Sequence, residues 1–410
     1  MRRVKPDELP DNLDKMRILS AASNLERGAD TLHQLEDEFR RRNPPDLMWA
    51  AQCLCEEGRW LCWSGRNSEA ELKLAEAFRI LPRGVRPSLD YFVNDCYAMA
   101  LGAAGKWSNS LAVARSGLSP WRDTSGHLLE PKLLERNSAL VSDIVGADCA
   151  MRSFDEALSF LRVQERELQA ADPTPDVVNY LRTLQVQALA RGRRVREALT
   201  LMTNLSADEN FSRADCVVAG ALALGANDLS AYKRWCATAV ARFTSGQDGS
   251  GAWEIARLLL AQPQSQTMVS VAEELVDRAE YARDYSAARA PGLRGWLEYR
   301  KGRYAEALTI FRRQPTDFKS IYGMARAAQS DPLTTDWGFQ RAMAALQLGQ
   351  LEEATNAFRK GLEVLEEPGG PAGKKRIDLG YFCSDWYLQN AARIEAEPLF
   401  REKGLPVPRL

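Results

Sequence analysis

The chain has 410 residues, of which 45% are hydrophobic and 27% are charged, a composition that is ordinary for a water-soluble protein. Lys and Arg total 54 against 55 Asp and Glu, so no net field attracts nucleic acid or anionic lipid. The apolar stretch Cys216–Ala226 is too short to cross a bilayer, and the N-terminal sequence lacks the apolar core of a secretory signal. We therefore expect a cytoplasmic protein that binds neither membranes nor nucleic acid.

Helical segments separated by short turns are predicted along the whole chain, because alanine is abundant and β-branched runs are scarce. Residues 12–42 are expected to form a first helix pair, with Gly28 at its turn. The next unit, from about Asp46 to Pro82, is a clearer helix hairpin with a glycine at the turn. Its marker residues fall at fixed intervals and are Gly58, Gly65, Ala70, Leu74, Ala77 and Pro82.

This spacing resembles the tetratricopeptide repeat, in which small residues let two antiparallel helices cross closely. Three further units carry the same pattern around a turn glycine. They comprise Ala98, Gly105, Trp107 and Ser110; Gly295, Gly302, Tyr304, Ala307 and Phe311; and Ala342, Gly349, Leu351, Ala354 and Phe358. Two intervening units are degenerate: Arg152–Leu158 lacks the turn glycine, and the segment after Gly192 carries it one residue out of place.

The resemblance implies an all-α fold, a right-handed superhelical α-solenoid of about nine antiparallel helix pairs. We expect an N-terminal capping pair in residues 1–45 and repeats in 46–243 and 252–367. Capping helices and a tail are expected in 374–410. The segment Thr244–Gly251 is rich in glycine and serine, which predicts a flexible joint between the two sets of repeats.

A second resemblance covers about Asp215 to Phe400. The segments that carry it are Ala231–Cys236, Arg242–Phe243, Ala261–Pro263, Asp385–Trp386 and Ala391–Glu397. They look like the repeat regions that follow the kinase domain in planctomycete-type bacterial serine/threonine kinases. The kinase domain itself is absent, since no catalytic loop precedes these segments. The resemblance implies a bacterial origin and a signalling context.

Few residues could support catalysis or metal binding. Only His33 and His127 are present, and Cys149 lies in an amphipathic stretch without a protease signature. Cys53, Cys55 and Cys62 suggest a zinc site, but no C-x-x-C pair or nearby histidine completes it. We therefore expect no catalytic residue, no cofactor and no metal ion, and the eight cysteines are expected to be reduced thiols in the core.

In the tetratricopeptide family the first helix of each pair lines a concave groove that binds peptides. Carrying its groove positions onto this chain gives candidate partner-binding residues, namely Arg59, Trp63, Arg289, Trp296, Tyr299, Arg300, Phe339 and Met343. Arginines beside aromatic residues are frequent at peptide-binding surfaces, although the tryptophans could equally pack between adjacent pairs. The Lys/Arg and Asn clamp that one subfamily uses for C-terminal carboxylates is missing.

The sequence thus predicts a non-catalytic scaffold or interaction module that binds a peptide segment or a partner protein in the concave groove. The alternative is a regulatory subunit of a separately encoded kinase or protease in a bacterial signalling or defence system. A third possibility, an enzyme in its own right, has the least support in the residues.

Overall fold

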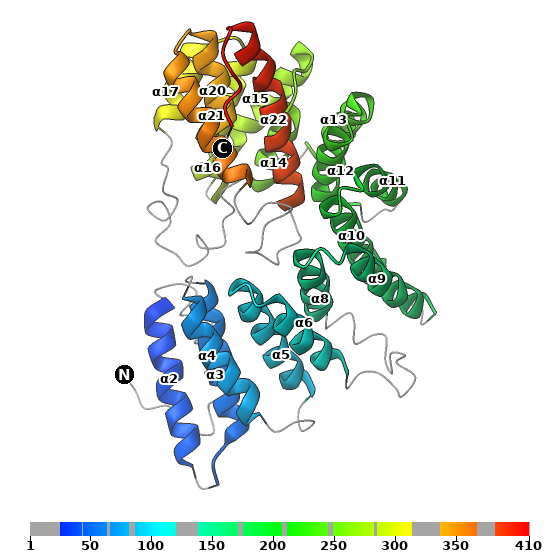
Figure 1. The fold of residues 1–410 in the computed structure, drawn as a ribbon, viewed down its shortest axis with the longest axis vertical. Coiled ribbons are helices and arrows are strands. Elements are labelled where there is room, and N and C mark those ends of the chain that lie inside the picture. The colour runs from blue at the N-terminus through cyan, green and yellow to red at the C-terminus, as the bar shows by residue number, and fades with distance from the viewer. Residues whose placement is uncertain are drawn as a thin grey trace.

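The computed structural model shows an all-helical protein (Figure 1), and no strand is present among the described residues. The structure describes residues 25–42, 44–63, 66–81, 87–119, 138–170, 175–206, 211–244, 249–282, 285–313, 337–366 and 382–409.

Within these ranges the helices pack as antiparallel neighbours in adjacent pairs. The first helices of the pairs are α3 (Leu47–Trp63), α5 (Pro87–Ala103), α8 (Ser138–Ala150), α10 (Pro175–Arg191), α12 (Arg213–Gly225), α14 (Gly249–Leu260), α16 (Tyr285–Arg300) and α20 (Gly338–Gln347). Their second helices are α4 (Asn67–Ile80), α6 (Trp107–Leu118), α9 (Phe154–Gln169), α11 (Val195–Leu205), α13 (Leu229–Phe243), α15 (Gln266–Glu280), α17 (Tyr304–Arg313) and α21 (Leu351–Glu366). Helix α2 (Leu25–Arg41) precedes the pairs, and helix α22 (Phe382–Glu402) follows them.

Six of the hairpin turns share one backbone geometry. The residue at the turn has a positive φ in each, and the residues are Gly105, Arg152, Arg193, Asn227, Gly302 and Gly349. In every case the next residue donates its N–H to the carbonyl five positions earlier, as in Ser153 to Asp148 (2.8 Å) and Arg303 to Glu298 (2.9 Å). This is the Schellman arrangement, which ends the first helix and lets the second begin within three residues.

Small residues allow the two helices of a pair to cross closely. A Cβ atom added to Gly58 in α3 would lie 2.4 Å from Cγ of Leu74 in α4. In the α16–α17 pair, a Cβ atom on Gly295 would lie 2.7 Å from Cε1 of Phe311, and Ala307 is fully buried. The helix crossings predicted from the repeat pattern therefore lie at these glycines.

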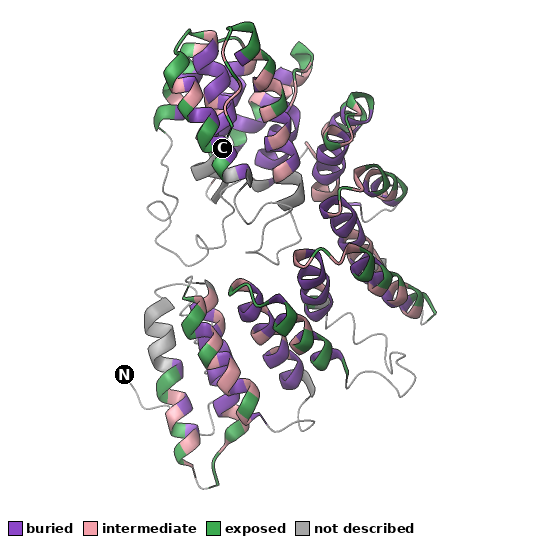
Figure 2. Cartoon of the chain, viewed as in Figure 1, coloured by how far each residue is buried: buried purple, intermediate pink, exposed green. Residues whose placement is uncertain are grey.

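The first helices are more deeply buried than the second (Figure 2). Every residue from Cys216 to Ala223 in α12 is buried, whereas its partner α13 buries one face only. A helix that is apolar on all sides has neighbours on all sides. The first helices thus form the interior, and the second helices cover them.

Two sequence-based expectations about chain organisation need comment. Gly28 lies inside the continuous helix α2, so the prediction of a turn at this glycine is wrong. A glycine within a helix is tolerated where the flanking residues form an amphipathic helix, as they do here. The expected joint at 244–251 falls partly outside the described residues, and α14 already begins at Gly249.

The path of the chain bends back on itself at its C-terminal end (Figure 1). The pairs follow one another from α3 to α21, and each first helix from α3 to α20 packs against the next, apart from α10 and α12. Helix α22 then contacts α20 and α21, but it also packs against α12 and α10, which lie about 200 residues earlier in the chain. The last helix therefore joins the two ends of the segment that begins at α12.

Candidate partner-binding surfaces

The eight residues predicted to bind a partner lie on three first helices. Arg59 and Trp63 belong to α3, Arg289, Trp296, Tyr299 and Arg300 belong to α16, and Phe339 and Met343 belong to α20. The side chains of Trp63 and Arg289 lie outside the described part of the structure. The other six have very different surroundings in the two halves of the chain.

Arg59 is the most accessible of the six, with 26% of its side chain exposed. Its guanidinium lies 3.0 Å from a carboxylate oxygen of Glu56, one turn earlier in α3, and 5.5 Å from the ring centroid of Phe92 in α5. A guanidinium over an aromatic face is held by cation–π attraction, and the exposed part of the Arg59 side chain can reach a ligand. Arg59 thus combines a positioned cation with exposure.

A carboxyl group that the motif analysis did not select, that of Asp95, lies near Arg59 and shares a hydrogen bond with a second carboxyl group, that of Asp143. Burial raises the pKa of Asp95 in α5 to about 6, although a hydrogen bond with Asp143 and the charge of Arg59 both oppose this shift. Burial, followed by the negative charge of Asp95, raises the pKa of Asp143 in α8 well above its usual range. At neutral pH Asp143 therefore holds the proton and Asp95 carries the charge. Acidic residues within the apolar first helices were the signal that could have revealed this pair.

Trp296 and Tyr299 in α16 are both buried. The ring of Trp296 meets Trp337 nearly edge-on, with centroids 5.7 Å apart, and Trp337 fills the space beside Gly292. The alternative in which the tryptophan packs between adjacent pairs therefore describes Trp296 in this structure.

Only 6% of the Arg300 side chain is exposed, and each of its three guanidinium nitrogens donates a hydrogen bond. Its Nε donates to the carbonyl of Leu260 in α14 (2.9 Å), and its two terminal nitrogens donate to the two carboxylate oxygens of Glu395 in α22 (2.5 and 2.8 Å). This bidentate geometry is the strongest form of a carboxylate–guanidinium pair. The groove residue Arg300 thus already binds an acidic side chain, and that side chain belongs to the same protein.

Phe339 and Met343 in α20 are buried as well. Phe339 packs edge-on against Phe358 of α21 (5.1 Å between centroids), which in turn packs edge-on against Phe400 of α22 (5.0 Å). The residue after Phe339, Gln340, donates to Gln389 of α22 at 3.4 Å. These contacts place α22 directly over α20.

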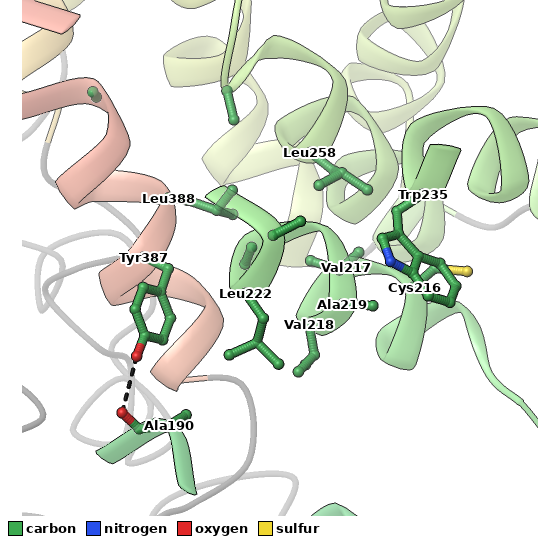
Figure 3. Close-up of a cluster of buried hydrophobic side chains, with 14 of the residues drawn as sticks. Ala190, Cys216, Val217, Val218, Ala219, Leu222, Trp235, Leu258, Tyr387 and Leu388 are labelled. Carbon is green, nitrogen blue, oxygen red and sulfur yellow. Dashed lines mark hydrogen bonds between the residues drawn. The ribbon is translucent and has the colours of Figure 1, made fainter. Parts of the chain in front are cut away.

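The other end of α22 reaches α10 and α12 (Figure 3). The hydroxyl of Tyr387 donates to the backbone carbonyl of Ala190 in α10 at 2.9 Å. Its ring lies against Gly225 in α12, where an added Cβ atom would come within 2.5 Å of the ring. Leu388 points toward the apolar side chains of α12, including Leu222. Helix α22 therefore lies against the first helices α10, α12, α16 and α20, which we call the first-helix row.

A surface hollow of about 590 Å³ lies between α17, α20 and α21. Its lining residues are Arg312, Arg341, Glu352, Glu353, Asn356, Ala357 and Lys360. Arg312 and Arg341 both donate to Glu353, at 3.0 and 2.7 Å, and the hydrogen bond from Arg312 is the main reason why the pKa of Glu353 is lowered. The charges in this hollow largely neutralise one another, so it offers no distinct ligand chemistry.

His33, Glu36 and Glu57 are close enough for their ligand atoms to surround one metal ion. However, Lys73 lies 3.3 Å from Nδ1 of His33 and 3.0 Å from Glu57, and Arg40 pairs with Glu36. An ion would have to displace both cations, so the group is better described as an ion-pair network. Burial of Cys53 and partial burial of Cys62 raise the pKa of each thiol to about 12, which disfavours the thiolate that binds metals.

In comparisons with known proteins, no family model matches the chain and no curated protein is significantly similar to it. None of the described helices is both long and apolar enough to cross a membrane.

Proposed function

We propose that this protein is a tetratricopeptide-like, right-handed superhelical array that serves as a non-catalytic binding module. The observation that carries the proposal is the hairpin turn repeated with the same hydrogen bonds in six places, three of them without glycine. A chain built of stacked hairpins offers an extended surface rather than a catalytic cleft.

The accessible part of this surface is the region around Arg59 on α3, α5 and α8. Arg59 supplies a cation held over Phe92, and Asp95 supplies an anion next to it. Such a pair suits a peptide segment or a protein loop that brings a carboxylate and a hydrogen-bond donor together. Trp63, the last residue of α3, is an aromatic residue at a predicted groove position of the repeat.

The test is retention of a partner from the source lysate by the full-length chain and by two charge-reversal variants. Arg59→Glu should reduce the retained amount of a stoichiometric partner by about tenfold or more, because a central arginine of an interface contributes about 2 kcal/mol or more of binding free energy. Arg79→Glu is the matched control, since Arg79 is an exposed arginine on the second helix α4. Circular dichroism should show that both variants fold.

Equal retention by both variants would mean that Arg59 is outside the binding surface. If the retained partner is a kinase or a protease whose activity changes in the complex, the regulatory-subunit interpretation replaces that of a free adaptor. Trp63→Ala provides a second measurement at the same surface, with the expectation of a loss similar to that of Arg59→Glu.

A further inference from the structure

The strongest unassigned feature of the molecule is the way in which α22 lies along the first-helix row. Three hydrogen-bonded contacts join it to three different first helices: Tyr387 to Ala190 of α10, Glu395 to Arg300 of α16, and Gln389 to Gln340 of α20. None of these helices is its neighbour in sequence. These contacts are those of a helix that packs against several repeats at once.

The side of α22 that faces the row has a simple pattern. Its buried apolar residues are separated by one, three or four positions and are Tyr387, Leu388, Ala391, Ala392, Ala396 and Phe400. Glu395 falls on the same side and contributes the one carboxylate that meets Arg300. The opposite side carries Ile394 and Arg401, which are exposed. Helix α22 is therefore amphipathic, with small residues at the centre and aromatic residues at both ends of its buried face.

We propose that α22 is an intramolecular ligand of the first-helix row, and that a partner binds this half by replacing α22 with an amphipathic helix of the same pattern. The inference rests on the proposed binding function and names the partner that this half of the groove takes. The replacing helix carries a carboxylate at the place of Glu395, one or two turns from an aromatic residue at the place of Phe400, and small residues between its ends.

The physical basis is that side chains of α16 and α20 have their full set of contacts only when a helix lies over them. Without α22, the guanidinium of Arg300 would lose its carboxylate partner and the aromatic cluster around Phe358 would lose Phe400. A buried cation without its partner is strongly unfavourable, so the row favours an occupied state. A tethered occupant has a high effective concentration, so a free competitor binds well only after α22 is weakened.

The test uses the full-length chain and a fluorescent peptide of residues 382–410 as the probe. A variant with Tyr387→Phe and Glu395→Lys weakens α22 in place, because it removes one hydrogen bond and sets a lysine against Arg300. The peptide should bind this variant at least about 100-fold more tightly than it binds the unaltered chain, as expected for removal of a tethered competitor.

Two peptide variants test the chemistry of the contact. Glu395→Lys in the peptide should weaken its binding to the opened chain by about tenfold or more, because it replaces a bidentate ion pair by repulsion. Glu397→Lys is the matched control, since Glu397 pairs only with Arg393 and Arg401 of α22 itself among the described interactions. Its binding should stay within about threefold of that of the unaltered peptide.

Three outcomes would overturn the inference: a folded opened chain that does not bind the peptide, equal loss for the two peptide variants, or unfolding of α12–α21 when α22 is weakened. The last would show that α22 is an integral core helix rather than a ligand. Each outcome is independent of partner retention at Arg59, so the binding function proposed for the N-terminal half could stand if this inference fails.

Discussion

Arg152, Arg193 and Asn227 each adopt a left-handed backbone at a position that glycine occupies in the other turns. Side chains with a Cβ atom are strained in this region, whereas glycine is not. In the unit after Gly192 the left-handed residue is Arg193, so the apparent offset of the glycine in the sequence pattern is explained: the turn is in register, but its residue is an arginine. The hydrogen bonds of the Schellman turn are strong enough to impose the conformation at these three sites.

This geometry predicts opposite effects for two substitutions at equivalent positions. Arg152→Gly should stabilise the protein by about 0.5–1 kcal/mol, because relief of left-handed strain exceeds the added flexibility of the unfolded chain. Gly302→Ala should destabilise it by about 1 kcal/mol from backbone strain alone, since no atom lies within 4 Å of the added Cβ. Thermal melting measures both, and shifts of the same sign would contradict the shared turn geometry.

The carboxyl pair Asp95 and Asp143 makes the stability of the N-terminal half depend on pH. Both pKa values are raised in the folded state, so the folded chain binds more protons than the unfolded chain above about pH 4. The stabilisation is therefore complete below the unfolded pKa and is lost as pH rises through about 6 and above. This direction is opposite to that of an ordinary ion-paired carboxylate.

Asp143→Asn removes the cost of keeping the buried Asp143 carboxyl protonated at high pH, while keeping a hydrogen-bond donor for Asp95. We expect the variant to be more stable than the unaltered chain at pH 8 and of similar stability at pH 4, because the cost is present only above the unfolded pKa. Urea unfolding at both pH values measures this. Asp155→Asn serves as the control, because Asp155 is exposed and should show no such pH-dependent gain.

At the scale of the helix pair, the crossing of α16 and α17 shows how far the sequence pattern reaches. The repeat pattern predicted Gly295 and Ala307 as the small residues at this crossing, and both are enclosed by the partner helix. Such local features follow from helix periodicity and from the volume of one side chain, so they are visible in a sequence. The same reasoning found the turn at Gly349 and a degenerate unit at Arg152–Leu158, but it could not show that Arg152 itself adopts the left-handed conformation, because left-handed arginine has no compositional signal.

Ala307→Leu should overpack this crossing. The three added carbon atoms have no space against α16, and the cost should be about 1–3 kcal/mol. In an array stabilised by neighbouring pairs, the loss should lower the melting temperature of the adjoining pairs also, rather than unfold one hairpin. Glu306→Ala is the surface control from the same turn of α17. Equal melting temperatures for the two variants would place Ala307 outside the crossing and would invalidate the repeat register.

The candidate site was harder to predict than the fold. Helix periodicity correctly assigned Trp296 and Phe339 to first helices, but it could not show which other segment covers them. That information lies in contacts between residues about 100–200 positions apart, such as Arg300 with Glu395 and Ala190 with Tyr387. Nor could a pattern of residue types show that Asp143 shares a proton with Asp95, since this depends on the approach of α8 to α5.

At the scale of the whole molecule, the buried residues fall into separate clusters. Two smaller clusters lie in α2–α5, and one large cluster extends from Tyr91 in α5 to Phe400 in α22. The large cluster is continuous because α22 returns to α12 and α10 instead of extending the array. The segment from α12 to α22 is therefore closed by its own last helix, whereas the helices before α10 pack against neighbouring pairs.

This closure predicts two different patterns of amide hydrogen exchange. In the closed segment, α22 should open on its own, as expected of a replaceable helix, so its amides should exchange at a lower free energy than those of α12 and α20. Tyr387→Phe removes the hydrogen bond to Ala190 and should lower that free energy by about 1 kcal/mol. The carbonyl of Ala190 still accepts from Arg193, so no buried acceptor is left unsatisfied.

Helices α3 and α4 should exchange as before in this variant, because they share no buried cluster with α22. Tyr281→Phe is the matched control, since the side chain of Tyr281 is 87% exposed and its substitution should leave all helices unchanged. Acceleration of exchange by Tyr387→Phe in α22 but not in α12 is the expected result, because the last helix then opens alone. Equal acceleration in α12, α20 and α22 would mean that α22 is an integral part of one cooperative unit, which would contradict the inference that it is a replaceable ligand.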